Sequence, residues 1–377
     1  MKKKILYLTP GCFDKGGISR YSRYQIAALR ELFGDGQVRV LSLLGPTKDS
    51  FEIPMKVFWH SLSNALSDKI RFTLTALKQA LLWKPDVIHV AHVNFSGLAV
   101  ILAKLCGAVT VLNTYGLEVW SGFSKDALWG LKKVDWVISD CHYTANYLEQ
   151  QNYRPHQSVK VFWDCVDLNR FTQGPVDPEV VDKYKVFSPD EYFVVMSLGR
   201  LSKGAMHKGY DRLIKSIALI ANDYENLRLV IAGKGDNRSF LEAMAQAEGL
   251  GDKVVFTGAV DEDDLAGLYR TASVFSLVSD RGEGRGEGIP LTPLEAMACG
   301  VPVIVGNQDG SQEAVEEEKN GKVVDPFDLQ SHAEAIKELI ENSELLRKKR
   351  KESKKVAREK FSYESFKSKH EKFYLEI

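Results

Sequence analysis

The chain has 377 residues, 44% of them hydrophobic, which is enough for two domains that each bury a core. Its 50 basic and 50 acidic residues balance, so no overall field would draw it onto nucleic acid. The five cysteines are scattered without a Cys-x-x-Cys pair, so the sequence suggests neither a disulfide framework nor a thiolate metal site and favours a cytoplasmic location. The apolar runs are too short for a signal sequence or a membrane span, so we expect no segment to cross a bilayer.

The first part of the chain alternates between short β-branched runs and segments with helical periodicity. Strand-like runs occupy residues 3–9, 37–44, 86–93, 109–115 and 134–140, and helix-like runs occupy residues 18–32 and 98–107. This alternation predicts βαβ units around a parallel sheet.

The same alternation resumes after a proline-containing, polar stretch near residues 168–188, which we interpret as a linker. Strand-like and helix-like runs follow at 192–200, 210–223, 227–233, 253–260, 272–280, 294–300 and 302–306. The predicted fold is therefore α/β, with two Rossmann-like doubly wound domains facing a central cleft. The predicted boundaries are 1–175 for the first domain, 185–358 for the second domain, and 359–377 for a C-terminal helix that packs back on the first domain.

Residues 343–377 are helical in composition and strongly basic. Such runs are usually solvated helix faces, but a basic amphipathic helix can also rest on anionic lipid. We therefore expect peripheral contact with the inner face of an anionic membrane as one reading of this segment.

The loops after the strands carry the candidate chemistry, because ligands of open α/β sheets bind beyond the carboxyl ends of the strands. In "TPGCFDKGGISRY", Gly16 and Gly17 lead from a strand into a helix, where backbone amides can approach an anion. The loop lacks the G-x-G-x-x-G spacing and the Walker ending, which disfavours a dehydrogenase or a P-loop NTPase. A simple tight turn remains the alternative.

In "SLGRLSKGAMHKGYDRL", Arg200 ends a predicted strand and Lys208 stands just before a helix. Arginine and lysine are the usual anion clamps, so two cations converging at a strand end indicate a phosphate site. Lys203, like Lys208, is followed by a glycine, but we do not assign it to the phosphate site.

In "RGEGRGEGIPLTPLEAMACG", Thr292, Pro293 and Glu295 read as a capping box at a helix start. Glu295 therefore has a structural explanation as well as a functional one. Glu287 has no such explanation, because a carboxylate in a glycine-flanked loop needs solvent or a polar ligand.

These residues carry a resemblance to a known family. "EGIPLTPLEAMACGVPVIV", "DGSQEAV", "SLGRL", "KGYDRL", "LVIAGKGD" and "VVFTGAV" in the second half resemble the retaining nucleotide-sugar glycosyltransferases of family four, which have the GT-B fold. "DKGGISRY", "PDVIHVAH", "TYGLEVW" and "VDLNRF" extend the resemblance more loosely over the first half. Glu287 and Glu295 have the family spacing of seven intervening residues.

The resemblance implies that the first domain is the acceptor domain and the second the nucleotide-sugar donor domain, and it gives each candidate residue a role. Arg200 and Lys208 would hold the donor diphosphate, the backbone of Leu291 and Thr292 would cradle it, Glu295 would hold the ribose and Glu287 would grip sugar hydroxyls. Gly16 and Gly17 would close over the diphosphate, and the segments near Gly233 and Val260 would flank the base. The implied partners are a nucleotide sugar, UDP by default, and a saccharide or lipid-linked saccharide acceptor. Neither a cofactor nor a metal ion is implied, and the reaction would retain configuration at the anomeric carbon.

Two departures from the family pattern affect the expected site. Pro290 stands where glycine is usual and removes an amide donor, and Tyr115 stands where many members have a histidine that meets the donor sugar. His89 and His92 are not expected to bind metal, because on a strand they point to opposite faces and no third ligand is apparent.

Two other functions remain open from the sequence. A sugar-nucleotide epimerase of the same fold would act on the donor without an acceptor, and a sugar-nucleotide sensor would bind it without turnover.

Overall fold

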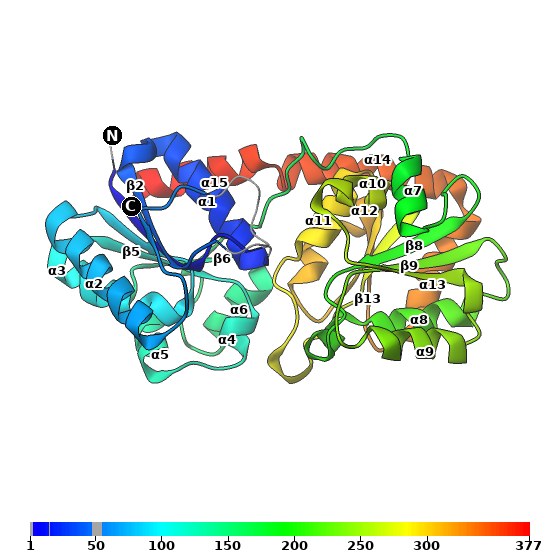
Figure 1. Cartoon of the computed structure of the whole chain (residues 1–377), viewed down its shortest axis with the longest axis horizontal. Helices are drawn as coiled ribbons and strands as arrows, with labels where there is room; N and C mark the ends of the chain where they lie inside the picture. The colour runs from blue at the N-terminus through cyan, green and yellow to red at the C-terminus, as the bar shows by residue number, and fades with distance from the viewer. Residues whose placement is uncertain (1–2, 15, 47–54) are drawn as a thin grey trace. The chain divides into compact units, whose positions relative to one another are not determined.

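The computed structural model describes residues 3–14, 16–46 and 55–377, and the chain in it separates into two compact units. Unit 1 combines Met1–Cys165 with Tyr363–Ile377, and unit 2 is Val166–Ser362. The contact-based division thus falls at 165/166 and 362/363, where the sequence places boundaries at 175/185 and 358/359. Both units are parallel α/β sandwiches (Figure 1).

Unit 1 is built on a sheet of seven strands in the order β3-β2-β1-β4-β5-β6-β7, all paired in parallel. Its elements are β1 (Ile5–Gly11), α1 (Gly17–Phe33), β2 (Val38–Leu44), β3 (Trp59–His60), α2 (Leu66–Trp83), β4 (Val87–Val90), α3 (Ser96–Cys106), β5 (Val109–Thr114), α4 (Leu117–Trp120), α5 (Lys125–Lys133), β6 (Trp136–Ser139), α6 (His142–Gln150), β7 (Val159–Val161) and α15 (Tyr363–Glu376).

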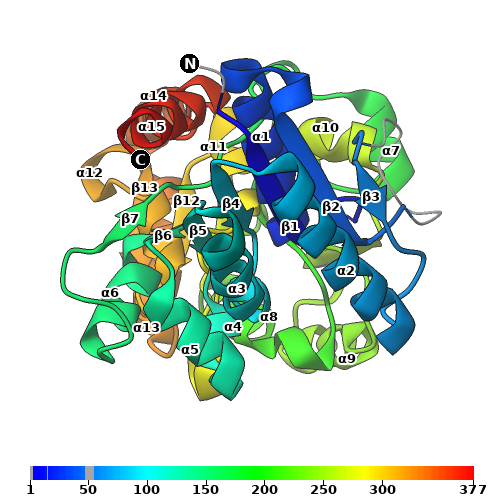
Figure 2. The same ribbon diagram turned by 90° about the vertical axis from the view of Figure 1, so that its left-hand side faces the viewer.

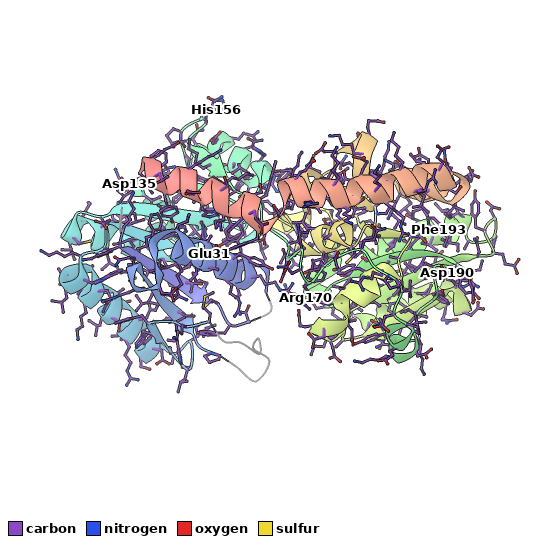
Figure 3. The ribbon with its side chains drawn as sticks, turned by 90° about the horizontal axis from the view of Figure 1, so that it is seen from above. Glu31, Asp135, His156, Arg170, Asp190 and Phe193 are labelled. Atoms are coloured by element: carbon purple, nitrogen blue, oxygen red, sulfur yellow. The ribbon has the colours of Figure 1, made fainter. Side chains whose placement is uncertain are left out.

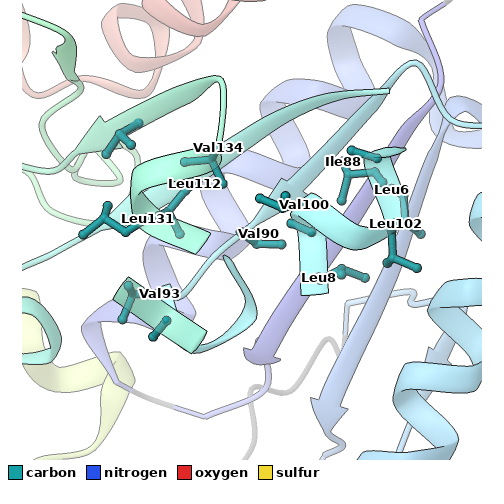
Figure 4. Packing of buried hydrophobic residues seen from close by; sticks show 14 of the residues in the cluster. Leu6, Leu8, Ile88, Val90, Val93, Val100, Leu102, Leu112, Leu131 and Val134 are labelled. Carbon is teal, nitrogen blue, oxygen red and sulfur yellow. The ribbon is translucent and has the colours of Figure 1, made fainter. Parts of the chain in front are cut away.

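The central strands of this sheet are buried on both faces and are mostly apolar, as expected for a parallel sheet covered on both sides. Leu6 and Leu8 of β1 pack with residues of α2, α3 and α5 on one face (Figure 4). Ile5 and Tyr7 of the same strand pack with α1 and α15 on the other face. Figure 2 shows these two helix layers on either side of the strands.

The last helix of the chain, α15, completes the core of unit 1. Its Phe373 and Tyr374 belong to the buried cluster beneath α1. Glu31 of α1, labelled in Figure 3, accepts hydrogen bonds from the Tyr363 hydroxyl and the Lys367 ammonium, both at 2.8 Å. The basic segment is thus divided, because the preceding helix α14 belongs to unit 2.

Unit 2 is built on a sheet of six parallel strands in the order β10-β9-β8-β11-β12-β13. Helices α8, α9 and α13 cover one face, and α10, α11 and α14 cover the other (Figure 1). Its elements are α7 (Pro178–Tyr184), β8 (Phe193–Leu198), α8 (Tyr210–Ile220), β9 (Leu227–Ala232), α9 (Arg238–Ala247), β10 (Val254–Gly258), α10 (Leu265–Arg270), β11 (Val274–Leu277), α11 (Leu291–Ala298), β12 (Val303–Gly306), α12 (Glu317–Asn320), β13 (Gly321–Val324), α13 (Leu329–Glu341) and α14 (Ser343–Lys360).

The stretch interpreted as a linker contains the helix α7, which the sequence reading missed. Asp177 caps it by accepting a hydrogen bond from the backbone N–H of Glu179, and Pro178 occupies its first turn. A β-carbon at Gly267 of α10 would lie 2.9 Å from Val180, so α7 packs tightly on α10. Asp177 and Pro178 therefore mark the start of a helix in this stretch, and not an unstructured linker.

Across the described ranges, no helix has both the length and the apolar character needed to span a bilayer.

Candidate functional site

The candidate residues of unit 2 gather at one edge of its sheet. Arg200 follows β8, Gly233 follows β9 and Val260 follows β10. The helix α11 begins at the end of the loop that follows β11. Because the strands are all parallel, their carboxyl ends meet at the same edge, where this fold class binds ligands.

Gly233 fixes the spacing of the strand ends at this edge. Its φ of +130° is in the region that side chains rarely adopt, and a β-carbon there would lie 1.8 Å from the carbonyl oxygen of Gly199. The Gly199 amide donates to the Ala232 carbonyl at 3.0 Å, and the Gly233 amide donates to the Gly258 carbonyl at 2.9 Å. The backbone after β8 therefore sits directly against the backbone after β9.

Lys208 and Glu287 form the polar centre of this edge. The Lys208 ammonium lies 2.6 Å from Glu287 Oε1, and the two side chains are 13% and 19% exposed. His207 Nε2 lies 3.0 Å from the same oxygen. His207 was not predicted; its only sequence signal was its place beside Lys208 in the loop before α8.

The Glu287 carboxylate is ionised because of these neighbours. Burial raises its pKa, but the Lys208 charge and the hydrogen bonds from His207 and Lys208 outweigh burial and lower the pKa to about 2. The loop thus presents an ionised hydrogen-bond acceptor, Glu287, beside the Lys208 ammonium. This loop contains the sequence RGEG twice in succession, at residues 281–288, with Glu283 in the first copy and Glu287 in the second. The side chain of Glu283 lies outside what the structure describes.

Asp309 holds the Glu287 backbone in place, and the sequence reading did not single it out. This carboxylate is completely buried and accepts hydrogen bonds from the Ser279 hydroxyl at 2.7 Å and from the Glu287 amide at 2.9 Å. It also accepts from the Ser311 amide at 3.0 Å and hydroxyl at 2.5 Å. The Gly310 amide in turn donates to the Glu287 carbonyl at 3.0 Å. The "DGSQEAV" segment therefore holds the backbone of Glu287 in place through these hydrogen bonds.

The burial of Asp309 has an electrostatic cost. Desolvation raises the pKa of its carboxyl to about 6, although the hydrogen bonds from Ser311, Ser279 and the Glu287 amide oppose this. The nearby Glu287 charge adds to the rise.

Arg200 directly follows Gly199 and is exposed. A β-carbon on Gly199, its chain neighbour, would lie 3.5 Å from the Lys208 side chain and 2.6 Å from the Tyr210 hydroxyl. Burial raises the pKa of Tyr210, the Glu287 charge raises it further and the Arg200 charge lowers it. Lys208 thus contacts Glu287, whereas the Arg200 side chain is open to solvent and acts on Tyr210 through its charge.

The helix α11 starts earlier than the capping-box prediction, which is wrong. Pro290 is the N-cap residue and makes no side-chain capping bond, so Thr292 is the second helical residue. Proline fixes φ near the value at which the chain enters the helix, and it sets the start two residues upstream. Leu291 and Thr292 are partly exposed and contribute first-turn amides at this end of the helix.

Glu295 is part of the interior of unit 2. Its side chain is only 3% exposed, and its Oε2 accepts a hydrogen bond from the Tyr269 hydroxyl at 2.8 Å. A tyrosine of α10 therefore orients this carboxylate from the protein side. Tyr269 is a further residue that the motif did not reveal.

The candidates in unit 1 are of two kinds. Gly16 and Gly17 are exposed, and Gly16, the N-cap residue of α1, has an ordinary φ of −74°. A β-carbon on Gly17 would meet nothing within 4 Å. Backbone conformation therefore does not require glycine at these two positions.

Tyr115, in contrast, is 8% exposed and belongs to a buried polar network. Its hydroxyl accepts from the Asn113 amide at 3.0 Å, which also donates to Gln25 at 2.7 Å. His89 joins the network through a 2.9 Å contact with the Asn113 carbonyl oxygen. Burial lowers the pKa of His89 to about 3, so the imidazole is neutral.

No three histidine, cysteine, aspartate or glutamate side chains in the described part of the chain are grouped so that they could hold a metal ion.

Two family models match the chain over most of its length. "Glycosyltransferase Family 4" matches residues 15–170, and "Glycosyl transferases group 1" matches residues 181–359. A GDP-mannose-dependent alpha-(1-6)-phosphatidylinositol monomannoside mannosyltransferase of Mycobacterium tuberculosis is 32% identical over 245 residues, covering 63% of this chain and 62% of the relative. The mannosylfructose-phosphate synthase of Agrobacterium fabrum is 36% identical over 143 residues, covering 36% of this chain and 30% of the relative.

Solved structures match the whole chain at low identity. HepE of Anabaena, in complex with UDP, superposes with a TM-score of 0.81 at 19% identity and covers 99% of this chain and 100% of its own. Sucrose-phosphate synthase from Thermosynechococcus elongatus superposes with a TM-score of 0.80 at 20% identity, covering 99% of each chain. The fold is therefore GT-B, and the chain belongs to the family-four glycosyltransferases.

Proposed function

We propose that the chain transfers a hexose from a nucleoside diphosphate sugar to a saccharide or glycolipid acceptor, with retention of configuration and without a bound metal ion. The observation that carries this proposal is the Lys208–Glu287 pair at the strand-end edge of unit 2. In this pair, a cation that can bind a phosphate is hydrogen-bonded to a carboxylate that can accept hydrogen bonds from sugar hydroxyls.

The chemistry demanded of these groups is stabilisation of a departing diphosphate. The bond between the anomeric carbon and the diphosphate oxygen breaks, the acceptor oxygen bonds to that carbon on the same face, and the acceptor proton leaves with the diphosphate. Arg200, Lys208 and the first-turn amides at Leu291 and Thr292 supply fixed positive charge for the growing negative charge. Glu287 accepts hydrogen bonds from the sugar.

The remaining roles concern the nucleoside. Glu295 would hold ribose hydroxyls through the carboxylate that Tyr269 orients, and the turns at Gly233 and Val260 would flank the base.

For the donor, GDP-mannose is the first candidate to test. The relatives named for GDP-mannose are identical to this chain at about a third of the aligned residues. The protein in the UDP complex is only 19% identical, and this level of identity supports a shared fold but not a shared donor. A UDP-sugar, which the sequence reading expected by default, is the second candidate. The mycobacterial relative is named for a phosphatidylinositol monomannoside acceptor, which makes a lipid-linked saccharide the acceptor class to test first.

The test is a panel of nucleotide sugars incubated with the protein, first without acceptor and then with phosphoinositide-linked and free saccharide acceptors. We expect slow donor hydrolysis alone and a faster, acceptor-dependent release of nucleoside diphosphate, with an α-linkage visible in the product by NMR. A new sugar nucleotide formed without acceptor would assign an epimerase instead. Donor binding without turnover in every arm would assign a sensor.

A further inference from the structure

The proposed transfer leaves His207 without a role, although this residue lies within the charged site of unit 2. Its Nε2 lies 3.0 Å from Glu287 Oε1, the same oxygen that the Lys208 ammonium contacts at 2.6 Å. The His207 side chain is only 12% exposed, so water competes little for this contact. Because an ionised carboxylate can only accept hydrogen bonds, Nε2 carries a proton and is the donor. The other ring nitrogen, Nδ1, is buried and has no hydrogen-bond partner among the described residues, so the imidazole is directed at Glu287 alone.

The backbone of His207 is held independently of Glu287. Its carbonyl oxygen accepts hydrogen bonds from the Asp280 amide at 2.8 Å and from Arg212 Nη2 at 3.2 Å. Arg212 in turn pairs with the Asp280 carboxylate at 2.7 Å, and both side chains are largely buried. These contacts join the loop before α8 to the loop after β11, which carries Glu287. The imidazole therefore projects from a fixed backbone and can hold the Glu287 carboxylate, as Asp309 holds the Glu287 amide.

We propose that His207 is a positioning residue, which keeps the Glu287 carboxylate directed at the donor sugar once Lys208 has engaged the diphosphate. In the free protein, burial raises the pKa of Glu287, and the Lys208 charge is the largest influence that lowers it. A diphosphate carries more negative charge than one carboxylate and attracts the ammonium more strongly. Glu287 then depends on His207 as its remaining donor. Both donors bond to Oε1, which leaves Oε2 to accept hydrogen bonds from sugar hydroxyls.

The role of His207 concerns the sugar end of the donor. It rests on the proposed function, in which Glu287 accepts hydrogen bonds from sugar hydroxyls while Arg200 and Lys208 bind the diphosphate. A defect at His207 should therefore slow transfer from an intact nucleotide sugar without weakening the binding of the nucleoside diphosphate alone. If His207 served only the folding of its loop, its loss would displace Lys208 as well, and the binding of both ligands would suffer.

The test compares substitutions of His207 that differ in reach. His207→Gln places an amide nitrogen near the position of Nε2, whereas His207→Asn carries the same amide on a side chain that is one methylene shorter. His207→Ala and His207→Asn should lower kcat about tenfold, because a hydrogen bond to a charged group is lost, and His207→Gln should stay within about threefold of wild type. The Kd values of GDP and UDP, measured by calorimetry, should not change in any of these variants. The matched control is His156→Ala in unit 1, which removes an exposed histidine 3.3 Å from Glu149 and should behave as wild type does (Figure 3).

A double variant shows whether His207 acts through Glu287. Adding His207→Ala to Glu287→Gln should cause no further loss of kcat, because the carboxylate that His207 positions is already gone. A second full loss in the double variant would overturn the role, and so would a wild-type kcat in His207→Ala. If His207→Ala does not fold, the pair of amide variants decides: equal kcat in His207→Gln and His207→Asn, or weaker binding of GDP and UDP in both, would assign His207 to the structure of the loop instead. A wild-type protein that turns over no nucleotide sugar would overturn the proposed function, and this role with it, so the two failures are distinguishable.

Discussion

The two units present their predicted site residues in opposite ways. In unit 2, Lys208 and Glu287 are paired at 2.6 Å and held by a buried carboxylate before any ligand arrives. In unit 1, Gly16 and Gly17 are exposed, while Tyr115 is tied into an interior network. Unit 2 therefore carries a charged site that is already assembled, and unit 1 contributes backbone and core.

The largest expected effect is the loss of a fixed cation from unit 2. Lys208→Ala or Arg200→Ala should lower turnover about a hundredfold or more, because each removes charge stabilisation that grows as the diphosphate leaves. Initial rates at saturating donor measure this. Lys203→Ala, an exposed lysine in the same loop, is the control and should stay near wild type. Near-normal rates in both single variants would remove the assigned role.

The next effect separates the two glutamates of the doubled motif. Glu287→Gln should slow transfer about ten- to a hundredfold, because a charged acceptor of hydroxyl hydrogen bonds becomes a neutral amide worth about 1.5–3 kcal/mol less. Glu283→Gln should stay within about threefold, since no part of the assigned machinery depends on it. The two variants are measured side by side at saturating donor. A greater loss of activity in Glu283→Gln than in Glu287→Gln would mean that Glu283, and not Glu287, binds the sugar hydroxyls.

A smaller effect should come from the support beneath the site. Asp309→Ala leaves the Glu287 amide and the Ser279 hydroxyl without their acceptor and should cost about tenfold in turnover, while Asp309→Asn should cost about threefold. The split between kcat and KM checks this, because a positioning residue should act mainly on kcat. An unchanged kcat in both variants would contradict the positioning role.

The pH dependence of stability provides a second measurement at Asp309. Its folded-state pKa is raised to about 6, above the value in the unfolded chain, so the folded state binds this proton more tightly. The resulting stabilisation is full below about pH 4 and is lost as pH rises through 6, by on the order of 1 kcal/mol per unit of pKa difference. Denaturant unfolding of wild type relative to Asp309→Asn should show this decline between pH 4 and 6. A flat difference would show that the carboxyl is not protonated in this range.

The smallest expected effect is that of metal removal. If the fixed cations of unit 2 stabilise the diphosphate, EDTA should leave the initial rate nearly unchanged. A strict requirement for added Mg²⁺ or Mn²⁺ would contradict the metal-free proposal.

The sequence predicted the fold class and the two sheets because parallel strands buried on both faces leave a continuous apolar signature. It also indicated Lys208 and Glu287, since charged residues in strand-end loops stand out against that background. It missed His207, Asp309 and Tyr269, whose importance comes from contacts across 22 to 80 residues of sequence. Likewise α2 was not predicted, because apolar side chains on both its buried and its exposed side blur a single amphipathic period.

The division of unit 1 into two sequence segments has a consequence for biosynthesis. Phe373 and Tyr374 of α15 form part of the core under α1, yet they are translated after all of unit 2. During synthesis, the sheet of unit 1 therefore lacks the cover of α15 on one face until unit 2 has been translated. Unit 2 is contiguous and can close its core first, so the order of folding should run against the order of synthesis.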